Sequence, residues 1–346
     1  KRVWRFYTVP GPGEPGHETW GGDSWRYGCG PAWLPGTYDA ALHLVYIGIG
    51  NPCPMFSGDE RPGDNLYTNA IAALDPDTGQ LKWYFQVIPH DLWDYDAANE
   101  LVLVDMAVDG KPVKALLQAN KNGYVYALDR SNGRLLYAKP FVARINWTKG
   151  LDAMGRPSLG AFPTPAGAVV CPSAFGAKSW NHMAYHPERG QVYIPAMDMC
   201  QRMKQVQMNP RRGIVYKGGE GPLLGAGAEG VLQAIDVQTG ERRWQYRSRY
   251  PMMASVLATG GGLVFTGDVE GNALAFDASD GKLLWSFGTG SGHRGSGISY
   301  AVGGKQYVAV PSGWGGVAGR SFSYAFPALA NAPRGSTLYV FGLPEE

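Results

Sequence analysis

The stretch Asp75-Pro-Asp77-Thr-Gly79-Gln-Leu-Lys-Trp83 occurs in four versions along this chain of 346 residues. Each version places a Gly four residues after an Asp and an aromatic residue four residues after that Gly; the other three begin at Asp129, Asp236 and Asp277. Asp and Gly are typical of tight turns, because Asp bonds to the nearby backbone and Gly adopts left-handed conformations. The pattern therefore predicts a turn that joins two strands.

The spacing of these turns predicts the fold. A short apolar segment precedes each turn (70–74, 124–128, 232–235 and 273–276), and the intervals between the aromatic residues are 54, 107 and 41 residues. Periods of about 40–50 residues with four strands each are typical of propeller blades. The long interval predicts a degenerate copy near residues 187–193. We therefore expect an all-β propeller of which this chain supplies about five blades.

Composition and charge exclude several classes of function. Only 17% of the residues are charged, the net charge is +2, and no run of like charges occurs, so we expect no nucleic-acid partner. No segment approaches the ~20 apolar residues of a membrane span. Residues 1–6 resemble the inside of a strand and the tail of the repeat. The chain is thus expected to begin within a blade, with the missing N-terminal blades supplied by a longer protein or by another chain.

The four cysteines lie far apart, with no CxxC and no CxxCH motif, so zinc and c-type haem are not expected. Their even number fits two disulfides formed in an oxidising compartment, and four buried free thiols are the alternative.

The segment His90-Asp91-Leu92-Trp93-Asp94-Tyr95-Asp96 is the strongest sign of chemistry in the chain. It follows an apolar segment, residues 81–87, that is expected to form a buried strand. Carboxylates at the end of a buried strand are costly unless they serve a metal, a cofactor or catalysis. In an extended chain Asp94 and Asp96 project to the same side and could hold one cation between them.

Together with the repeat, residues 50–52 (Gly-Asn-Pro), 61–65 (Arg-Pro-Gly-Asp-Asn) and 93–96 (Trp-Asp-Tyr-Asp) resemble the quinoprotein alcohol dehydrogenases. This is the methanol/ethanol dehydrogenase family, which uses pyrroloquinoline quinone (PQQ) and a metal ion in an eight-bladed propeller. The resemblance covers essentially the whole chain but only the C-terminal portion of a usual member. It implies that residues 1–346 form a single incomplete propeller domain.

The resemblance also implies roles for individual residues. Asp94 matches the catalytic base, which lies beside the metal. The implied metal ligands are Asn51, Asp94 and Asp96. The residues implied at the quinone are Trp33, Lys121, Ser179, Trp180 and Trp314.

Asp96 bears on the identity of the metal. An Asp two residues after the base resembles the additional ligand of lanthanide-using members, and a trivalent ion favours more anionic oxygen than Ca²⁺ does. Sugar-oxidising quinoproteins carry a similar Asp. We expect a lanthanide rather than calcium.

The resemblance implies a structural disulfide between Cys171 and Cys200 and suggests a second between Cys29 and Cys53. The chain departs from the family in lacking its vicinal cysteine pair and its Glu metal ligand. Ser179 stands in place of a common Asn, and Met253 stands in place of a common Trp.

Each implied role has a structural alternative. Trp33 and Trp314 could pack between blades, Lys121 could be a solvated turn residue, and Asn51 could shape a turn before Pro52. His90 is expected to form a structural hydrogen bond, because the expected metal prefers oxygen ligands.

The function implied is periplasmic, PQQ- and metal-dependent oxidation of a primary alcohol to the aldehyde. Hydride passes to PQQ with help from the base, and electrons leave to a cytochrome c. The alternatives are a PQQ-dependent sugar or polyol dehydrogenase and a non-catalytic propeller scaffold of the bacterial envelope.

Overall fold

The structure, a computed structural model, describes residues 1–343 of the chain. These residues form antiparallel sheets with one α-helix, α1 (Gly316–Ala325), and short 3-10 helices. The all-β prediction is confirmed. The described residues divide into two compact units, residues 1–180 with 200–221 and residues 181–199 with 222 onward. A single incomplete domain over residues 1–346 stays a prediction. The 3-10 helices are η1 (His17–Thr19), η2 (Ser24–Tyr27), η3 (Pro187–Arg189) and η4 (Pro327–Leu329).

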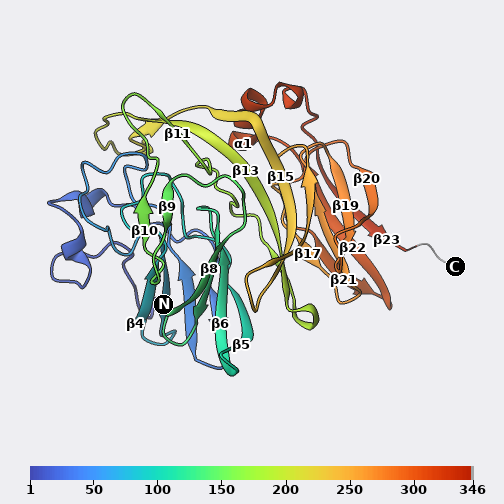
Figure 1. The fold of residues 1–346 in the computed structure, drawn as a ribbon, viewed down its shortest axis with the longest axis horizontal. Helices are drawn as coiled ribbons and strands as arrows, with labels where there is room; N and C mark the ends of the chain where they lie inside the picture. Colours follow the sequence, from blue (N-terminus) through green and yellow to red (C-terminus); the bar gives the residue numbers. More distant parts are fainter. Residues whose placement is uncertain (344–346) are drawn as a thin grey trace. The chain divides into compact units, whose positions relative to one another are not determined.

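The first unit contains two four-stranded sheets whose strands follow one another in chain order (Figure 1). The first contains β1 (Thr37–Asp39), β2 (Leu44–Gly48), β3 (Ala70–Leu74) and β4 (Leu81–Gln86). The second contains β5 (Val102–Val108), β6 (Lys111–Ala119), β7 (Tyr124–Asp129) and β8 (Leu135–Pro140). A hairpin of β9 (Thr148–Leu151) and β10 (Pro157–Leu159) follows, and β11 (Ala168–Val170) and β14 (Gly219–Glu220) pair with the end of β13 (Gln191–Gln205).

The second unit contains three sheets. In the first of these, β13 has β15 (Leu223–Asp236) and then β16 (Arg242–Ser248) on one side, and it also pairs with β12 (Ala184–His186). The next is four-stranded, with β17 (Leu257–Ala258), β18 (Leu263–Gly267), β19 (Asn272–Asp277) and β20 (Leu283–Gly288). The last is three-stranded, with β21 (Ile298–Val302), β22 (Lys305–Gly313) and β23 (Ser336–Gly342).

The four repeated turns have one geometry, as the sequence pattern predicted. The glycine N–H donates to the aspartate carbonyl at 2.8–2.9 Å in all four, and the glycine φ lies between 71° and 78°. A register shift precedes every turn, as between Ala73 and Leu74. Because such positive φ angles suit glycine, the repeat fixes a bulged turn at the end of each of these hairpins.

In two of the repeats the tryptophan packs on the turn of the next repeat. The Trp83 indole N–H donates to the carbonyl of Arg130 at 3.2 Å, and a Cβ on Gly133 would lie 2.6 Å from the Trp83 ring. Trp244 makes the same contacts with the turn of Gly281, where the Cβ would lie 2.3 Å from the indole. Glycine is thus required for two reasons, its conformation and the space that the indole occupies.

For residues 1–6 the sequence predicted a strand and the tail of the repeat, and only the second prediction is correct. Trp4 donates from its indole to the Pro76 carbonyl at 2.7 Å and packs against Gly79, so it makes the contacts of the repeat. However, residues 1–6 join no sheet among the residues that the structure describes, and the predicted strand there is wrong.

The predicted degenerate copy near residues 187–193 is also wrong. That segment is η3 and the start of β13, which pairs with β12, so it connects the first two strands of a sheet rather than the last two. Tyr193 donates from its hydroxyl to the carbonyl of Ala278, as Tyr46 of β2 does to that of Arg130. The long interval comes instead from inserted chain, including the β9–β10 hairpin.

Both disulfides implied by the resemblance are present. Cys29 and Cys53 are joined with their Cα atoms 5.3 Å apart, and Cys171 and Cys200 with theirs 4.3 Å apart. None of the helices among residues 1–343 has the length and hydropathy to cross a membrane.

Candidate active site

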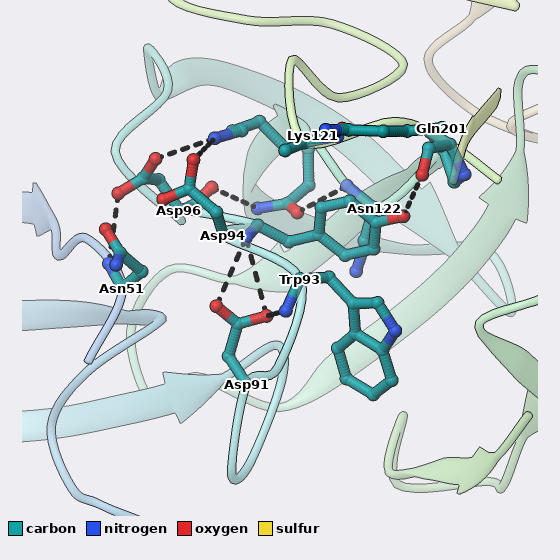
Figure 2. A network of polar contacts seen from close by, with 12 residues as sticks. Asn51, Asp91, Trp93, Asp94, Asp96, Lys121, Asn122 and Gln201 are labelled. Carbon is teal, nitrogen blue, oxygen red and sulfur yellow. Dashed lines mark hydrogen bonds and ion pairs between the residues drawn. The ribbon is translucent and has the colours of Figure 1, made fainter. Parts of the chain in front are cut away.

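The acidic segment forms a tight loop after β4. Asp91 is buried, and its carboxylate accepts hydrogen bonds from the backbone N–H groups of Trp93 (3.0 Å) and Tyr95 (3.2 Å). Trp93 and Tyr95 enter the hydrophobic core with their rings stacked, 5.9 Å between centroids. Because alternate side chains are committed to the core, Asp94 lies on the other side of the loop (Figure 2).

Asp94 and Asp96 converge on Lys121, as Figure 2 shows. The Lys121 ammonium lies 2.8 Å from Asp96 Oδ2 and 3.4 Å from Asp94 Oδ2. The backbone of Asp94 has φ +64°, a left-handed conformation that Asp tolerates better than most residues. The side chain of Asp94 keeps 23% of its surface exposed, against 9% for Asp96. Asp94 is therefore the carboxylate that a ligand can reach.

Lys121 comes from the connection between β6 and β7. The Asn120 side chain accepts the N–H of Asn122 at 3.0 Å, which closes the turn. Gly176 lies against Lys121, since a Cβ there would come 2.7 Å from the Lys121 side chain. The solvated turn residue considered as the alternative is thereby excluded, because Lys121 is buried and paired.

The electrostatics of the three groups are coupled. Burial raises the pKa of Asp94, an effect that Lys121 reduces and Asp96 increases. Burial alone would lower the pKa of Lys121, but the two carboxylates outweigh it and raise that pKa. The cluster holds two carboxylates against one ammonium, so it favours a further cation.

Asn51 follows β2 and joins the same cluster. Its backbone N–H donates to Asp96 Oδ1 at 3.0 Å, and its side-chain nitrogen donates to the Pro52 carbonyl at 2.9 Å. A Cβ on Gly50 would lie 2.6 Å from Asp96 Oδ1. Glycine at this position therefore permits the Asn51 segment and the Asp96 carboxylate to approach.

A buried arginine connects the Asn51 segment with the acidic loop. Arg61, with 0% exposure, donates to the Pro54 carbonyl at 2.9 Å, to Asn65 Oδ1 at 2.8 Å and to the Asp91 carbonyl. Pro54 follows the Asn51 segment, and Asp91 opens the acidic loop. Burial lowers the pKa of Arg61 to about 10, which leaves it charged at neutral pH. Arg61 thus holds both segments by their main chains.

The chemistry of the donor set fits a hard cation. Two carboxylates and one amide oxygen lie on neighbouring segments, and oxygen is the ligand that Ca²⁺ and lanthanide ions prefer. Within residues 1–343, no cluster of three or more His, Cys, Asp or Glu side chains could hold a metal, so further ligands have to complete the shell. His90 is a hydrogen-bonding residue as predicted, with Nδ1 2.8 Å from the Gly63 carbonyl.

The predicted quinone residues lie in both units. Trp33 is 44% exposed in the segment that leads to β1, and the carbonyl of Ser179 accepts hydrogen bonds from Asn99 (2.7 Å) and Lys178 (3.3 Å). Trp180 follows it, partly buried, at the end of the same stretch of the first unit. Trp314 belongs to the second unit, where it is buried against Phe322. Their roles stay predictions, whereas Lys121 forms an ion pair with Asp96 of the acidic loop.

Sequence analysis assigned no individual role to the residues that support the main chain of the site. Arg61 and Asp91 act through main-chain bonds, and a buried amide chain runs from the Asp96 carbonyl through Asn120 and Gln118. Asp91 had a usable signal, because an Asp two residues before a core Trp is typical of a side-chain-capped turn. The local sequence around Asn120 and Gln118 gave no signal of their role.

Comparison with known proteins shows which family the chain resembles. A family model described as the β-propeller domain of glucose/ethanol/alcohol dehydrogenases matches residues 1–140, and one described as outer membrane protein assembly factor BamB matches residues 173–323. The quinoprotein alcohol dehydrogenase PedH of Pseudomonas putida is 40% identical over 96% of this chain and 58% of its own length. The chain belongs to the quinoprotein alcohol dehydrogenase family.

Solved structures of the quinoprotein alcohol dehydrogenase family confirm the propeller fold. The quinohemoprotein alcohol dehydrogenase ADHIIG of Pseudomonas putida superposes with a TM-score of 0.88, at 33% identity, over 98% of this chain and 54% of its own. A europium-containing methanol dehydrogenase gives 0.87 at 32% identity, over 99% of this chain and 65% of its own. The chain spans about half the length of the curated relatives it matches, 58% of PedH and 48% of the quinohemoprotein ADH-IIG.

Proposed function

We propose that this chain carries the catalytic base and part of the metal site of a PQQ-dependent dehydrogenase that oxidises a primary alcohol to the aldehyde. The observation that supports it most strongly is the meeting of Asn51, Asp94, Asp96 and Lys121 in one polar cluster. These residues come from three separate connections, and turn formation alone gives no reason for them to converge.

Within this proposal, Asn51, Asp94 and Asp96 hold the metal ion. The quinone is held by Trp33, Lys121, Ser179, Trp180 and Trp314. When bound, PQQ supplies a two-electron acceptor that the metal polarises as a Lewis acid. Lys121 is buried and would stabilise the negative charge of a reduced quinone with its ammonium group.

Asp94 removes the hydroxyl proton of the alcohol. Its side chain is the more exposed of the two carboxylates, and burial raises its pKa, which makes it a stronger base than a solvated Asp. Asp96 is fixed by both Lys121 and the Asn51 N–H, so it serves as a ligand rather than a proton carrier. The two carboxylates thus have separate roles, Asp94 as the base and Asp96 as a metal ligand.

The second carboxylate favours a lanthanide over calcium. Asp96 adds an anionic oxygen to the set, which suits a trivalent cation. The likeness to a europium-containing methanol dehydrogenase supports this choice.

Electron transfer to a cytochrome c and a periplasmic location complete the proposal. Two disulfides agree with an oxidising compartment. A sugar or polyol dehydrogenase would use the same residues and differ in the substrate pocket.

A non-catalytic scaffold is the second candidate, and the BamB model over residues 173–323 favours it. That match excludes the segments of Asn51, Asp94, Asp96 and Lys121, which a scaffold does not need. We therefore prefer the enzyme.

Replacement of Asp94 separates the two candidates. In a preparation that turns over alcohol with PQQ and La³⁺, Asp94→Ala should lower kcat by about 10²–10⁴-fold, the usual contribution of a general base. Asp94→Asn, of equal size, controls for packing. An unchanged kcat in both variants would contradict the assignment of Asp94 as the base.

A further inference from the structure

We propose that the Cys29–Cys53 disulfide is a positioning tether, which holds the Trp33 segment and Asn51 in the register that the metal and quinone require. This inference rests on the function proposed above. Cys53 lies two residues after Asn51, and Cys29 lies four residues before Trp33, so one covalent bond joins the segments that carry a predicted metal ligand and a predicted quinone residue.

Main-chain hydrogen bonds around the disulfide define the register. The Gly30 N–H donates to the Asn51 carbonyl at 3.1 Å, and the Cys53 N–H donates to the Gly28 carbonyl at 3.1 Å. The Gly50 N–H donates to the Pro31 carbonyl at 2.8 Å. The two segments therefore run antiparallel, with Cys29 opposite Pro52.

This short pairing continues the β1–β2 hairpin, in which Thr37 pairs with Tyr46, beyond the ends of both strands. Residues 30–36 join none of the sheets among the described residues, and Cys29 and Gly30 both have left-handed backbones, with φ of 63° and 65°. Beyond the strand ends the pairing has only two strands, and two-stranded pairings are marginal in water. The disulfide is thus the strongest bond that keeps the Trp33 segment on the Asn51 segment.

Displacement of the Asn51 segment would reach the acidic loop directly. The Asn51 N–H donates to Asp96 Oδ1, and Gly50 has no room for even a methyl group beside that oxygen. A small shift of residues 50–53 would therefore break the contact that aligns Asn51 with Asp96. The tether acts through Asn51, without itself touching substrate or metal.

The second disulfide provides a matched control. Cys29–Cys53 and Cys171–Cys200 close loops of 24 and 29 residues, so loss of either releases a similar chain entropy on unfolding. Cys171→Ser/Cys200→Ser should therefore lower stability about as much as Cys29→Ser/Cys53→Ser. Only the latter should weaken the site.

The test is binding of Tb³⁺, followed by its tryptophan-sensitised luminescence, and of PQQ, followed by tryptophan quenching. We expect Cys29→Ser/Cys53→Ser to weaken Tb³⁺ binding by about 10–100-fold, the usual effect of losing a group that orients a ligand. It should also weaken PQQ binding, while Cys171→Ser/Cys200→Ser retains its affinity for Tb³⁺. Equal Tb³⁺ affinity in the two double variants would overturn the tether.

If Cys29→Ser/Cys53→Ser does not fold, the control variant provides the second test. Cys29–Cys53 is its only remaining disulfide, so a thiol reductant opens that bond alone. Release of Tb³⁺ with unchanged far-ultraviolet circular dichroism would support the tether, and retention would overturn it. Failure of the wild-type protein to bind Tb³⁺ at all would instead reject the proposed metal site.

Discussion

Lys121 is the residue whose charge balances the site. It is buried between two carboxylates, and removal of one partner from a buried ion pair leaves charge without compensation. Lys121→Met should therefore lower the free energy of unfolding by about 3–5 kcal/mol, as measured by urea denaturation without metal. Lys121→Arg keeps the charge and serves as the control. Equal stability of Lys121→Met and the wild-type protein would contradict the pairing.

Asp91 makes the stability depend on pH. Burial raises its pKa from 3.8 in the unfolded chain to about 6. The folded state therefore binds this proton more tightly, so the contribution of Asp91 to stability is greatest below pH 4, falls as the pH rises to 6, and is constant above.

The corresponding test compares the wild-type protein with Asp91→Asn. The Asn side chain keeps an oxygen that can accept hydrogen bonds from the N–H groups of Trp93 and Tyr95, but it does not titrate. Between pH 4 and pH 7 the wild-type protein should lose about 2 kcal/mol relative to the variant, as measured by denaturant unfolding. A difference that does not change with pH would show that Asp91 titrates normally.

The sequence predicted the charged members of the site because they occur in short motifs. Asp94 and Asp96 lie on one side of the loop and both contact Lys121, as their spacing indicated. Arg61 was named only as part of a motif. Its three acceptors are separated from it by up to 30 residues, and such a constellation exists only after folding.

The repeated turn is the element that sets the fold. Gly133 has φ 78° and faces the Trp83 ring, whereas Gly110 has a similar φ of 74° and open space around it. Gly110→Ala should thus cost only the left-handed strain, about 1–2 kcal/mol. Gly133→Ala should cost about 1–3 kcal/mol more, because the methyl group collides with the indole.

Thermal or urea unfolding of the two glycine variants checks this prediction. The difference between them isolates the contact of Trp83 with the turn, since the backbone strain is common to both. Equal destabilisation would mean that the indole does not depend on the glycine.

The repeats predicted hairpins correctly, but not which strands a degenerate segment joins. Residues 187–193 contain a Gly followed by a Tyr, as a degenerate copy of the motif would. They nevertheless connect β12 and β13. Spacing alone could not distinguish the two hairpins of one sheet, because both place an aromatic residue near the following turn. Tyr193 and Trp244 both donate to the carbonyl of Ala278.

For the molecule as a whole, sequence and comparison agree on family and fold, and four site residues of the first unit, Asn51, Asp94, Asp96 and Lys121, lie together. Trp314 is in the second unit, and its part in the quinone site stays a prediction. The chain's likeness to its relatives extends over both units, and the metal site proposed here rests on the first alone.

The decisive measurement is a PQQ titration of the wild-type protein and Asp96→Ala, followed by tryptophan quenching, with Ca²⁺ or La³⁺ present. We predict saturable quenching that is tighter with La³⁺ in the wild-type protein, and loss of that preference in Asp96→Ala. Quenching that is equal in the two ions for both proteins would contradict the role of Asp96. No quenching under any condition would contradict the quinone site itself.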